Sequence, residues 1–407
     1  MCPVGVKSAG RWKNYIELTT LFFLYGMALG MWWVPLTTIL GVQGFEEIRP
    51  YAFATSGLAA LVSPLILGAL ADRHVGPVRV LGWVTLAAAT LTALTSWGIQ
   101  QRWNPWLVLV LIQGLTLFLA PASSISTTIV LARLADARRE FGPIRSVATV
   151  GWMTGCWLIS ALNADSSPVA GYVGAAVWLA LAAFTKVLPH VTPPKSIEQL
   201  TLKQRLGLDA LSLLKNHDHR VIFITAALIS IPLAAFYPFT PPHLLELGLE
   251  RTSAWMTLGQ VTEIVAMLGL STLLLRWRLK WIFMLGIGFA VLRYVFCAMN
   301  GTGWVLTGVT LHGFAFTLFF VTVPIYLNER IDAAWRARAQ ALFTLMTSGV
   351  GNLIGYLGTG WWFNFCARPG GTRWPLFWGG LSAAVAVVMI YFLIAYHGRG
   401  KQPAVKQ

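Results

Sequence analysis

Long apolar segments recur along the whole chain, and each is about as long as a helix that crosses a bilayer, roughly 20 residues. Only 11% of the residues are charged, against about a quarter in soluble domains. Because lipid offers backbone groups no hydrogen-bond partner, such segments must be helices. We therefore predict an all-α membrane protein with twelve transmembrane helices, over residues 15–40, 51–71, 78–98, 105–133, 139–163, 168–188, 221–245, 254–275, 281–299, 303–327, 337–365 and 374–397.

The longest polar stretch runs from Val191 to Arg220 and separates six predicted spans from the other six. Two six-helix bundles joined by a central loop are typical of transporters built from repeats. We therefore predict an N-terminal bundle over residues 1–190, a cytoplasmic loop over 191–220 and a C-terminal bundle over 221–407. Within the loop, the amphipathic segment 206–216 is expected to form a surface helix.

The basic residues predict an orientation. Most of the 30 lysine and arginine residues fall on one side of the predicted spans when the amino terminus is placed on that side. The positive-inside rule then puts both termini in the cytoplasm. This bias explains the net charge of +15 and makes nucleic acid a poor partner, so the basic loops are expected to contact anionic lipid headgroups. The four cysteines lack metal-ligand spacing, and we expect neither a metal site nor a cofactor.

A short charged loop, GALADRHVGPVR, connects the second and third predicted spans from Gly68 to Arg79. It resembles the signature loop of the major facilitator superfamily, although Gly76 falls one residue later than in the usual pattern. Asp72 and Arg73 are therefore interpreted as parts of a cytoplasmic gate, in which an acid pairs with basic groups. The alternative is a solvated turn that carries positive-inside charges.

Arg145 lies inside the fifth predicted span, in the segment GPIRSVATVGW. A cation there costs about 2.5–3.5 kcal/mol on insertion scales unless it faces a cavity or a partner. Thr149 and Trp152 follow at i+4 and i+7, so the three side chains share one helix face. This face offers hydrogen bonds and a stacking ring to a polar, planar ligand. In the alternative interpretation, Arg145 extends to the membrane surface.

Gln260 and Glu263 lie three residues apart in the eighth predicted span, within GQVTEIVAMLGL. Of the acids within predicted spans, Glu17 and Glu140 lie near span ends, so Glu263 is the one deep carboxylate that the sequence predicts. Burial raises the pKa of a carboxylate and a nearby cation lowers it, so Glu263 is a candidate for binding protons or substrate. The alternative is a static ion pair with Arg293 or Arg145.

His312 and Phe316 lie one turn apart in LHGFAFTLFF, in the tenth predicted span. His312 is a candidate for binding substrate or carrying a proton, and Phe316 for a stacking wall. The alternative for the histidine is a packing residue in an apolar helix. Prolines are expected to kink or open several spans around a cavity; they are Pro35, Pro64, Pro121, Pro232, Pro238 and Pro324.

Several of these segments, in order along nearly the whole chain, resemble the nucleoside:proton symporter family of the major facilitator superfamily. They are GALADRH, GPIRSVATVGW, KVLPHV, LGLDALSLLKN, GQVTEI, AVLRYVFCA, HGFAF and NERIDAAWRARAQALF, of which PIRxxxTxG is the most specific. The resemblance implies a twelve-helix fold, alternating access, and uptake of nucleosides with protons across the bacterial inner membrane. We expect a monomer.

The resemblance also assigns roles to individual residues. The family's ligand arginine, threonine and aromatic residue on span five match Arg145, Thr149 and Trp152. The family's glutamine and glutamate on span eight match Gln260 and Glu263. Its span-ten phenylalanine matches Phe316, whereas the tyrosine one turn earlier is His312 here.

Two departures from the family pattern bear on specificity and coupling. The acid that follows the span-ten phenylalanine in the family is Thr317 in this chain. The polar amide positions on span seven fall in AAFYPFTPP, where this chain has Ala235 and Pro238. Fewer polar partners weaken the assignment of a nucleoside, and the loss of one acid leaves coupling to Glu263 alone or abolishes it.

The sequence thus predicts a proton-coupled uptake carrier for nucleosides or similar polar, ring-bearing solutes. One alternative is an uncoupled facilitator, or a carrier of another solute such as a sugar or a peptidoglycan fragment. The other is a membrane-embedded enzyme or sensor, for which no HExxH motif, Gly-rich phosphate loop or second deep acid is found.

Overall fold

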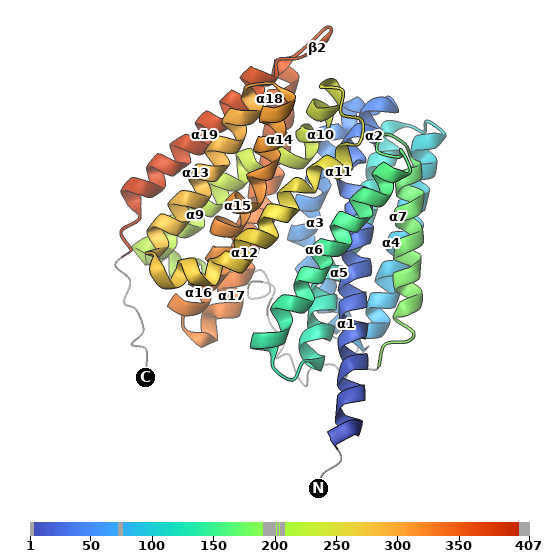
Figure 1. Cartoon of the computed structure of the whole chain (residues 1–407), viewed down its shortest axis with the longest axis vertical. Helices are drawn as coiled ribbons and strands as arrows, with labels where there is room; N and C mark the ends of the chain where they lie inside the picture. Colours follow the sequence, from blue (N-terminus) through green and yellow to red (C-terminus); the bar gives the residue numbers. More distant parts are fainter. Residues whose placement is uncertain (1–3, 72–75, 190–200, 202, 204–207, 399–407) are drawn as a thin grey trace. The chain divides into compact units, whose positions relative to one another are not determined.

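The computed structural model describes residues 4–71, 76–189, 201, 203 and 208–398, and this part is mostly helical (Figure 1). In the described part, eight helical segments are long and apolar enough to cross a membrane. They are Trp12–Val42, Pro77–Gln100, Pro105–Arg133, His217–Glu246, Leu279–Ala298, Thr302–Arg330, Trp335–Cys366 and Trp374–Ala395. The chain is therefore a multi-pass membrane protein, as predicted.

The chain divides into two compact units, the first of which comprises residues 1–48 and 65–197. Its helices are α1 (Val4–Trp33), α2 (Leu36–Val42), η1 (Glu46–Ile48), α4 (Pro77–Gln100), α5 (Pro105–Arg133), α6 (Ala137–Ala161) and α7 (Val169–Phe184). Within this unit α1 packs against α6 and α7, and α4 packs against α5 and α7.

Glycines set the close approach of α1 and α6. Each helix has two glycines four residues apart, Gly26 and Gly30 on α1 and Gly151 and Gly155 on α6, the small-xxx-small pattern of closely packed membrane helices. A Cβ atom added at Gly26 would lie 1.9 Å from the backbone oxygen of Ala148, and one at Gly151 would lie 2.1 Å from that of Phe23. The two backbones are therefore in contact, which fixes the position of α6.

The second unit comprises residues 49–64 and 198–407, so that helix α3 (Arg49–Ala71) is shared between the units. The helices that follow are η2 (Leu208–Lys215), α9 (His217–Leu233), α10 (Phe236–Glu246), α11 (Thr252–Met256), α12 (Leu258–Arg276), α13 (Leu279–Ala298), α14 (Thr302–Thr310), α15 (His312–Phe316), η3 (Thr317–Val321), α16 (Thr322–Arg330), α17 (Ala333–Thr344), η4 (Leu345–Gly351), α18 (Asn352–Cys366) and α19 (Trp374–Ala395). Strands β1 (Ala367–Arg368) and β2 (Gly371–Thr372) form a short antiparallel hairpin between α18 and α19. Helix α13 packs against α19, α14 and α15, and α12 packs against α15.

The effect of the prolines differs from site to site. Helix α1 ends just before Pro35, which is the N-cap residue of α2. Helix α9 ends one residue after Pro232. By contrast, α5 continues through Pro121, and α10 contains Pro238 in its first turn. Of the two π-helical turns, η3 ends three residues before Pro324, in the first turn of α16, whereas η4 has no proline within or beside it. Such turns are often found at functional sites.

Two expectations concern the polar loops. The segment predicted as a surface helix over 206–216 is described from Leu208 to Lys215, where it is a 3-10 helix held to α17 by an ion pair of 3.0 Å between Asp209 and Arg338. The predicted gate residues Asp72 and Arg73 lie outside the described residues.

Candidate functional site

The candidate residues of the first unit lie on one face of α6. Arg145 is exposed, and its guanidinium carbon lies 5.7 Å from the centre of the Phe22 ring on α1, a cation–π contact. Thr149 and Trp152 are partly buried one and two turns further along the same unbroken helix. The close packing of α1 against α6 holds this face in place. It presents a guanidinium, a hydroxyl and an indole in one row, as predicted from the spacing.

Gln260 is the best-defined polar residue of the second unit. It lies in the first turn of α12, its side chain is only 4% exposed, and its Nε2 donates a hydrogen bond of 3.1 Å to the Tyr237 hydroxyl on α10. Its Oε1 atom is buried and has no hydrogen-bond partner among the described residues. An unsatisfied buried acceptor costs about 1–3 kcal/mol. A ligand N–H or O–H would remove that cost.

Glu263 lies on the same side of α12, one turn after Gln260, and is partly buried. A close approach of two helices fixes its backbone, because a Cβ atom added at Gly313 on α15 would lie 2.0 Å from the Glu263 nitrogen. The hydroxyl of Thr317, the residue at the position of the family's second acid, lies 3.5 Å from the Glu263 carbonyl oxygen. Another carboxylate predicted within a span, Glu17, forms an ion pair with Arg133.

Arg293 is a cation buried within a membrane-spanning helix, with 1% of its surface exposed. Its guanidinium donates hydrogen bonds of 2.6 Å to His312 Nδ1 and 2.8 Å to the Tyr294 hydroxyl, and its carbon lies 4.6 Å from the centre of the Phe236 ring. Within the part of the chain that the structure describes, Arg293 makes no ion pair. A static pair of Arg293 with Glu263, one of the alternatives weighed above, is therefore not found.

The bond from Arg293 defines the protonation of His312. Arginine can only donate, so Nδ1 must accept and the ring proton must be on Nε2. A second proton on Nδ1 would break this bond and place two cations side by side. The geometry therefore disfavours the predicted role of His312 as a proton carrier and leaves its Nε2–H as a possible donor to a ligand.

Aromatic rings form a column beside these polar groups. The Phe236 ring stacks on His312 with 4.1 Å between ring centres and 6° between planes, and Phe316 stacks on His312 at 6.0 Å. Phe320 continues the column at 5.7 Å from Phe316. Phe316 is 37% exposed, so one ring of the column has a face available to a flat ligand.

The structure brings Gln260, Glu263, His312 and Phe316 together on adjoining helices of the second unit, and it places Arg145, Thr149 and Trp152 together in the first. Sequence reasoning missed three members of the second group. Phe236 and Tyr237 lie between Ala235 and Pro238, the two positions that were compared with the family, and Arg293 was considered only as a partner of Glu263. A search for aromatic residues beside a proline-linked helix break would have found the first two.

Comparison with known proteins identifies several relatives. The sequence model of a family described as Nucleoside H+ symporter matches residues 13–401. The putative nucleoside transporter YegT of Escherichia coli K12 is 32% identical over 359 residues, which cover 84% of this chain and 83% of that protein. The nucleoside permease NupG of the same strain is 26% identical over 405 residues, covering 93% and 95%. The crystal structure of NupG superposes with a TM-score of 0.83 at 25% identity, covering 94% of this chain and 99% of that one.

Proposed function

This chain belongs to the Nucleoside H+ symporter family, and we propose that it imports nucleosides together with protons by alternating access. It is a transporter and not an enzyme. The family match does not favour the alternatives of an uncoupled facilitator, a sugar or peptidoglycan carrier, or a sensor.

One observation supports this position for the binding site: the Oε1 atom of Gln260 is buried, has no hydrogen-bond partner among the described residues, and lies beside the aromatic column. Nucleosides combine a flat base with several N–H and O–H donors, which match a stacking face and an unsatisfied acceptor. In this proposal Gln260 accepts a hydrogen bond from the nucleoside, His312 donates one through Nε2–H, and the Phe316 ring packs on the base. We also propose that Arg145, Thr149 and Trp152 of α6 bind substrate, as the resemblance to the family implies.

Glu263 is proposed to couple transport to the proton. It binds a proton when the site is open to the outside and releases it to the inside with the nucleoside. One charge moved through 100 mV yields about 2.3 kcal/mol, enough for roughly fiftyfold accumulation. Because Thr317 replaces the family's second acid, the stoichiometry we propose is one proton for each nucleoside.

The finer architecture is also part of the proposal. We infer twelve spans in two six-helix bundles, over 1–190 and 221–407, in the manner of the major facilitator superfamily. Both termini and the loop 191–220 are cytoplasmic, and Asp72 and Arg73 belong to a cytoplasmic gate. The protein acts as a monomer in the bacterial inner membrane, with its basic loops against anionic lipid headgroups.

A ligand screen tests the substrate class. The purified protein is heated with nucleosides, free nucleobases and sugars, and its melting temperature is recorded. We expect nucleosides to raise the melting temperature in a concentration-dependent way, and sugars to have no effect. Stabilisation by sugars but not by nucleosides would overturn the proposed substrate class.

A further inference from the structure

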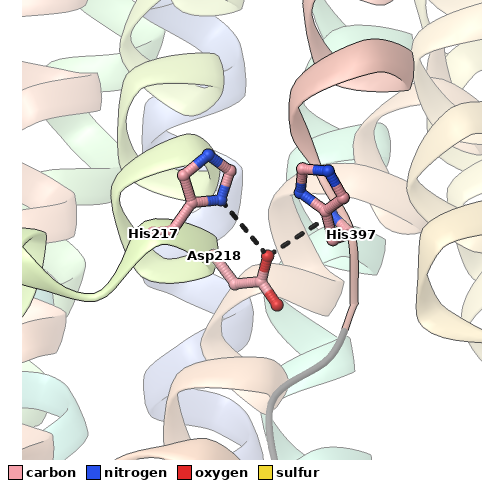
Figure 2. Close-up of side chains that lie close together, drawn as sticks. All are labelled: His217, Asp218 and His397. Atoms are coloured by element: carbon pink, nitrogen blue, oxygen red, sulfur yellow. Dashed lines mark hydrogen bonds and ion pairs between the residues drawn. The ribbon is translucent and has the colours of Figure 1, made fainter.

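A cluster of two histidines and one aspartate lies at one end of the second unit, where α9 begins and α19 ends (Figure 2). His217 and Asp218 begin α9, and His397 follows the last turn of α19. One ligand atom from each residue lies within 4.8 Å of the others, and no other such group of three is found within residues 4–71, 76–189 and 208–398. The ends of two helices, some 180 positions apart in the chain, thus meet at three metal-ligating side chains.

The geometry of the cluster leaves a gap between its polar atoms. Nδ1 of His217 lies 3.7 Å from Oδ1 of Asp218, which is too long for a hydrogen bond. In a tetrahedral zinc site, with bonds of about 2.0–2.1 Å, neighbouring ligand atoms are about 3.3 Å apart. The distance between His217 Nδ1 and Asp218 Oδ1 therefore needs to shorten by only a few tenths of an ångström to match such a site. The centres of the two imidazole rings are 5.2 Å apart.

Local structure holds the aspartate and leaves the histidines adjustable. Oδ1 of Asp218 accepts a hydrogen bond of 3.3 Å from the backbone N–H of His397, which ties the end of α19 to the start of α9 (Figure 2). The Asp218 side chain is 11% exposed, whereas that of His217 is 50% exposed and His397 is exposed as well. Exposed imidazoles can change rotamer to complete a site around a fixed carboxylate, and they leave a fourth position open to water.

The ligand types decide which cations fit. Two neutral imidazoles and one carboxylate suit zinc and the neighbouring transition metals, whereas calcium and magnesium require more oxygen ligands. The guanidinium of Arg330 interacts electrostatically with the same tyrosines as Asp218, namely Tyr326 and Tyr396, so its positive charge opposes every dication alike. The choice among cations therefore rests on the ligand types.

We propose that His217, Asp218 and His397 bind a divalent transition metal such as zinc, which clamps the start of α9 to the end of α19. The ligand spacing could not be found in the sequence, because the third ligand comes from the other end of the unit. Binding of the metal does not require that the chain transport nucleosides, so the failure of either proposal leaves the other standing.

Calorimetric titration of the full chain, purified without a polyhistidine tag, tests the site with ZnCl2 and with MgCl2. We expect one zinc per chain, no magnesium binding, and a rise in melting temperature with zinc. His217→Ala and His397→Ala each remove an exposed ligand and should weaken zinc binding roughly tenfold or more. Cobalt substituted for zinc should give the visible absorption of a four-coordinate site, and both variants should lose it.

Arg220→Gln is the matched control, since it changes an exposed side chain near the start of the same helix and leaves all three ligands in place. It should bind zinc as tightly as the unaltered chain. The proposal is overturned if the unaltered chain shows no saturable zinc binding, or if His217→Ala and His397→Ala bind zinc as the control does.

Discussion

At the scale of single residues, Arg293 shows how a charge is accommodated inside a membrane protein. Two hydrogen-bond acceptors and the faces of two aromatic rings, Phe236 and Tyr294, lie against its guanidinium, and none of these groups is a carboxylate. Its Nε has no hydrogen-bond partner among the described residues. A hydrogen bond to a charged group contributes about 1.5–3 kcal/mol, more than one between neutral groups. The Arg293–His312 bond therefore helps to hold α13 and α15 together and to orient the imidazole.

This account predicts the stability of variants at both positions. His312→Leu leaves a buried guanidinium without one acceptor and should destabilise the protein by about 1.5–3 kcal/mol. His312→Gln can still accept through its amide oxygen and should cost less. Replacing both partners, as His312→Leu with Arg293→Leu, should recover most of the loss, because no unpaired polar group remains. Melting temperatures in detergent give the order, and a double variant less stable than His312→Leu alone would contradict the account.

Gln260 gives a second test, because a substitution there should weaken nucleoside binding without lowering the stability of the protein to a similar degree. Gln260→Leu removes the unsatisfied Oε1 acceptor, a gain of about 1–3 kcal/mol, and also the Nε2 hydrogen bond to the Tyr237 hydroxyl, a loss of about 0.5–1.5 kcal/mol, so the melting temperature without ligand should change little. Nucleoside affinity should fall about five- to hundredfold, from the loss of one hydrogen bond of about 1–3 kcal/mol. Equilibrium binding of radiolabelled uridine measures this. Gln340→Leu, on α17 and outside the proposed site, is the control and should bind normally; equal affinity in both variants would refute the role of Gln260.

The sequence predicted which of these residues share a helix face, but not which residues they contact. Helical spacing was sufficient to predict that Arg145, Thr149 and Trp152 share a face and that Gln260 and Glu263 do. It could not predict the partners, because Tyr237, Arg293 and His312 come from other helices. A residue's neighbours across a helix interface depend on the rotation and separation of the helices, which one sequence does not specify.

At the scale of helices, the glycines at the contact of α1 and α6 control how α6 presents its polar face. Gly151→Ala places a Cβ atom 2.1 Å from the Phe23 backbone oxygen, so the helices must separate. We expect a loss of about 1–3 kcal/mol or more from overpacking, and weaker nucleoside binding. Thermal unfolding followed by size-exclusion chromatography measures the stability.

The matched control is Gly114→Ala on α5 of the same unit. The nearest atom to its added Cβ would be 3.7 Å away, which is ordinary contact. Alanine has a higher helix propensity than glycine, so this variant should be neutral or more stable by up to about 1 kcal/mol. Equal destabilisation of the two variants would show that the contact of α1 and α6 does not have the importance assigned to it.

The helices themselves follow from hydropathy, whereas their interruptions do not. The predicted span 337–365 divides into α17, η4 and α18 although it contains no proline, whereas η3 in the span 303–327 ends three residues before Pro324. Proline was an unreliable guide in the other direction too, since α5 passes through Pro121 without ending. Membrane helices tolerate such residues when neighbouring groups satisfy the freed backbone, and those neighbours are again a matter of packing.

For the molecule as a whole, we propose that a nucleoside and a proton are transported together and that Glu263 couples the two movements. The family establishes the class of transporter. The role of Glu263 rests on its position on α12, beside Gln260 and next to the close contact with α15. The resemblance to the family implies a second acid at the position of Thr317, so we propose that Glu263 alone carries the coupling.

Uptake of radiolabelled uridine into proteoliposomes, driven by an imposed proton gradient, is the decisive experiment for this coupling. The unaltered chain should accumulate uridine above the external concentration, and a protonophore should abolish the accumulation. Glu263→Gln, which mimics the protonated acid, should retain exchange of internal for external uridine but lose gradient-driven accumulation. Accumulation that persists in Glu263→Gln, or unaltered protein that equilibrates uridine without concentrating it, would contradict the account.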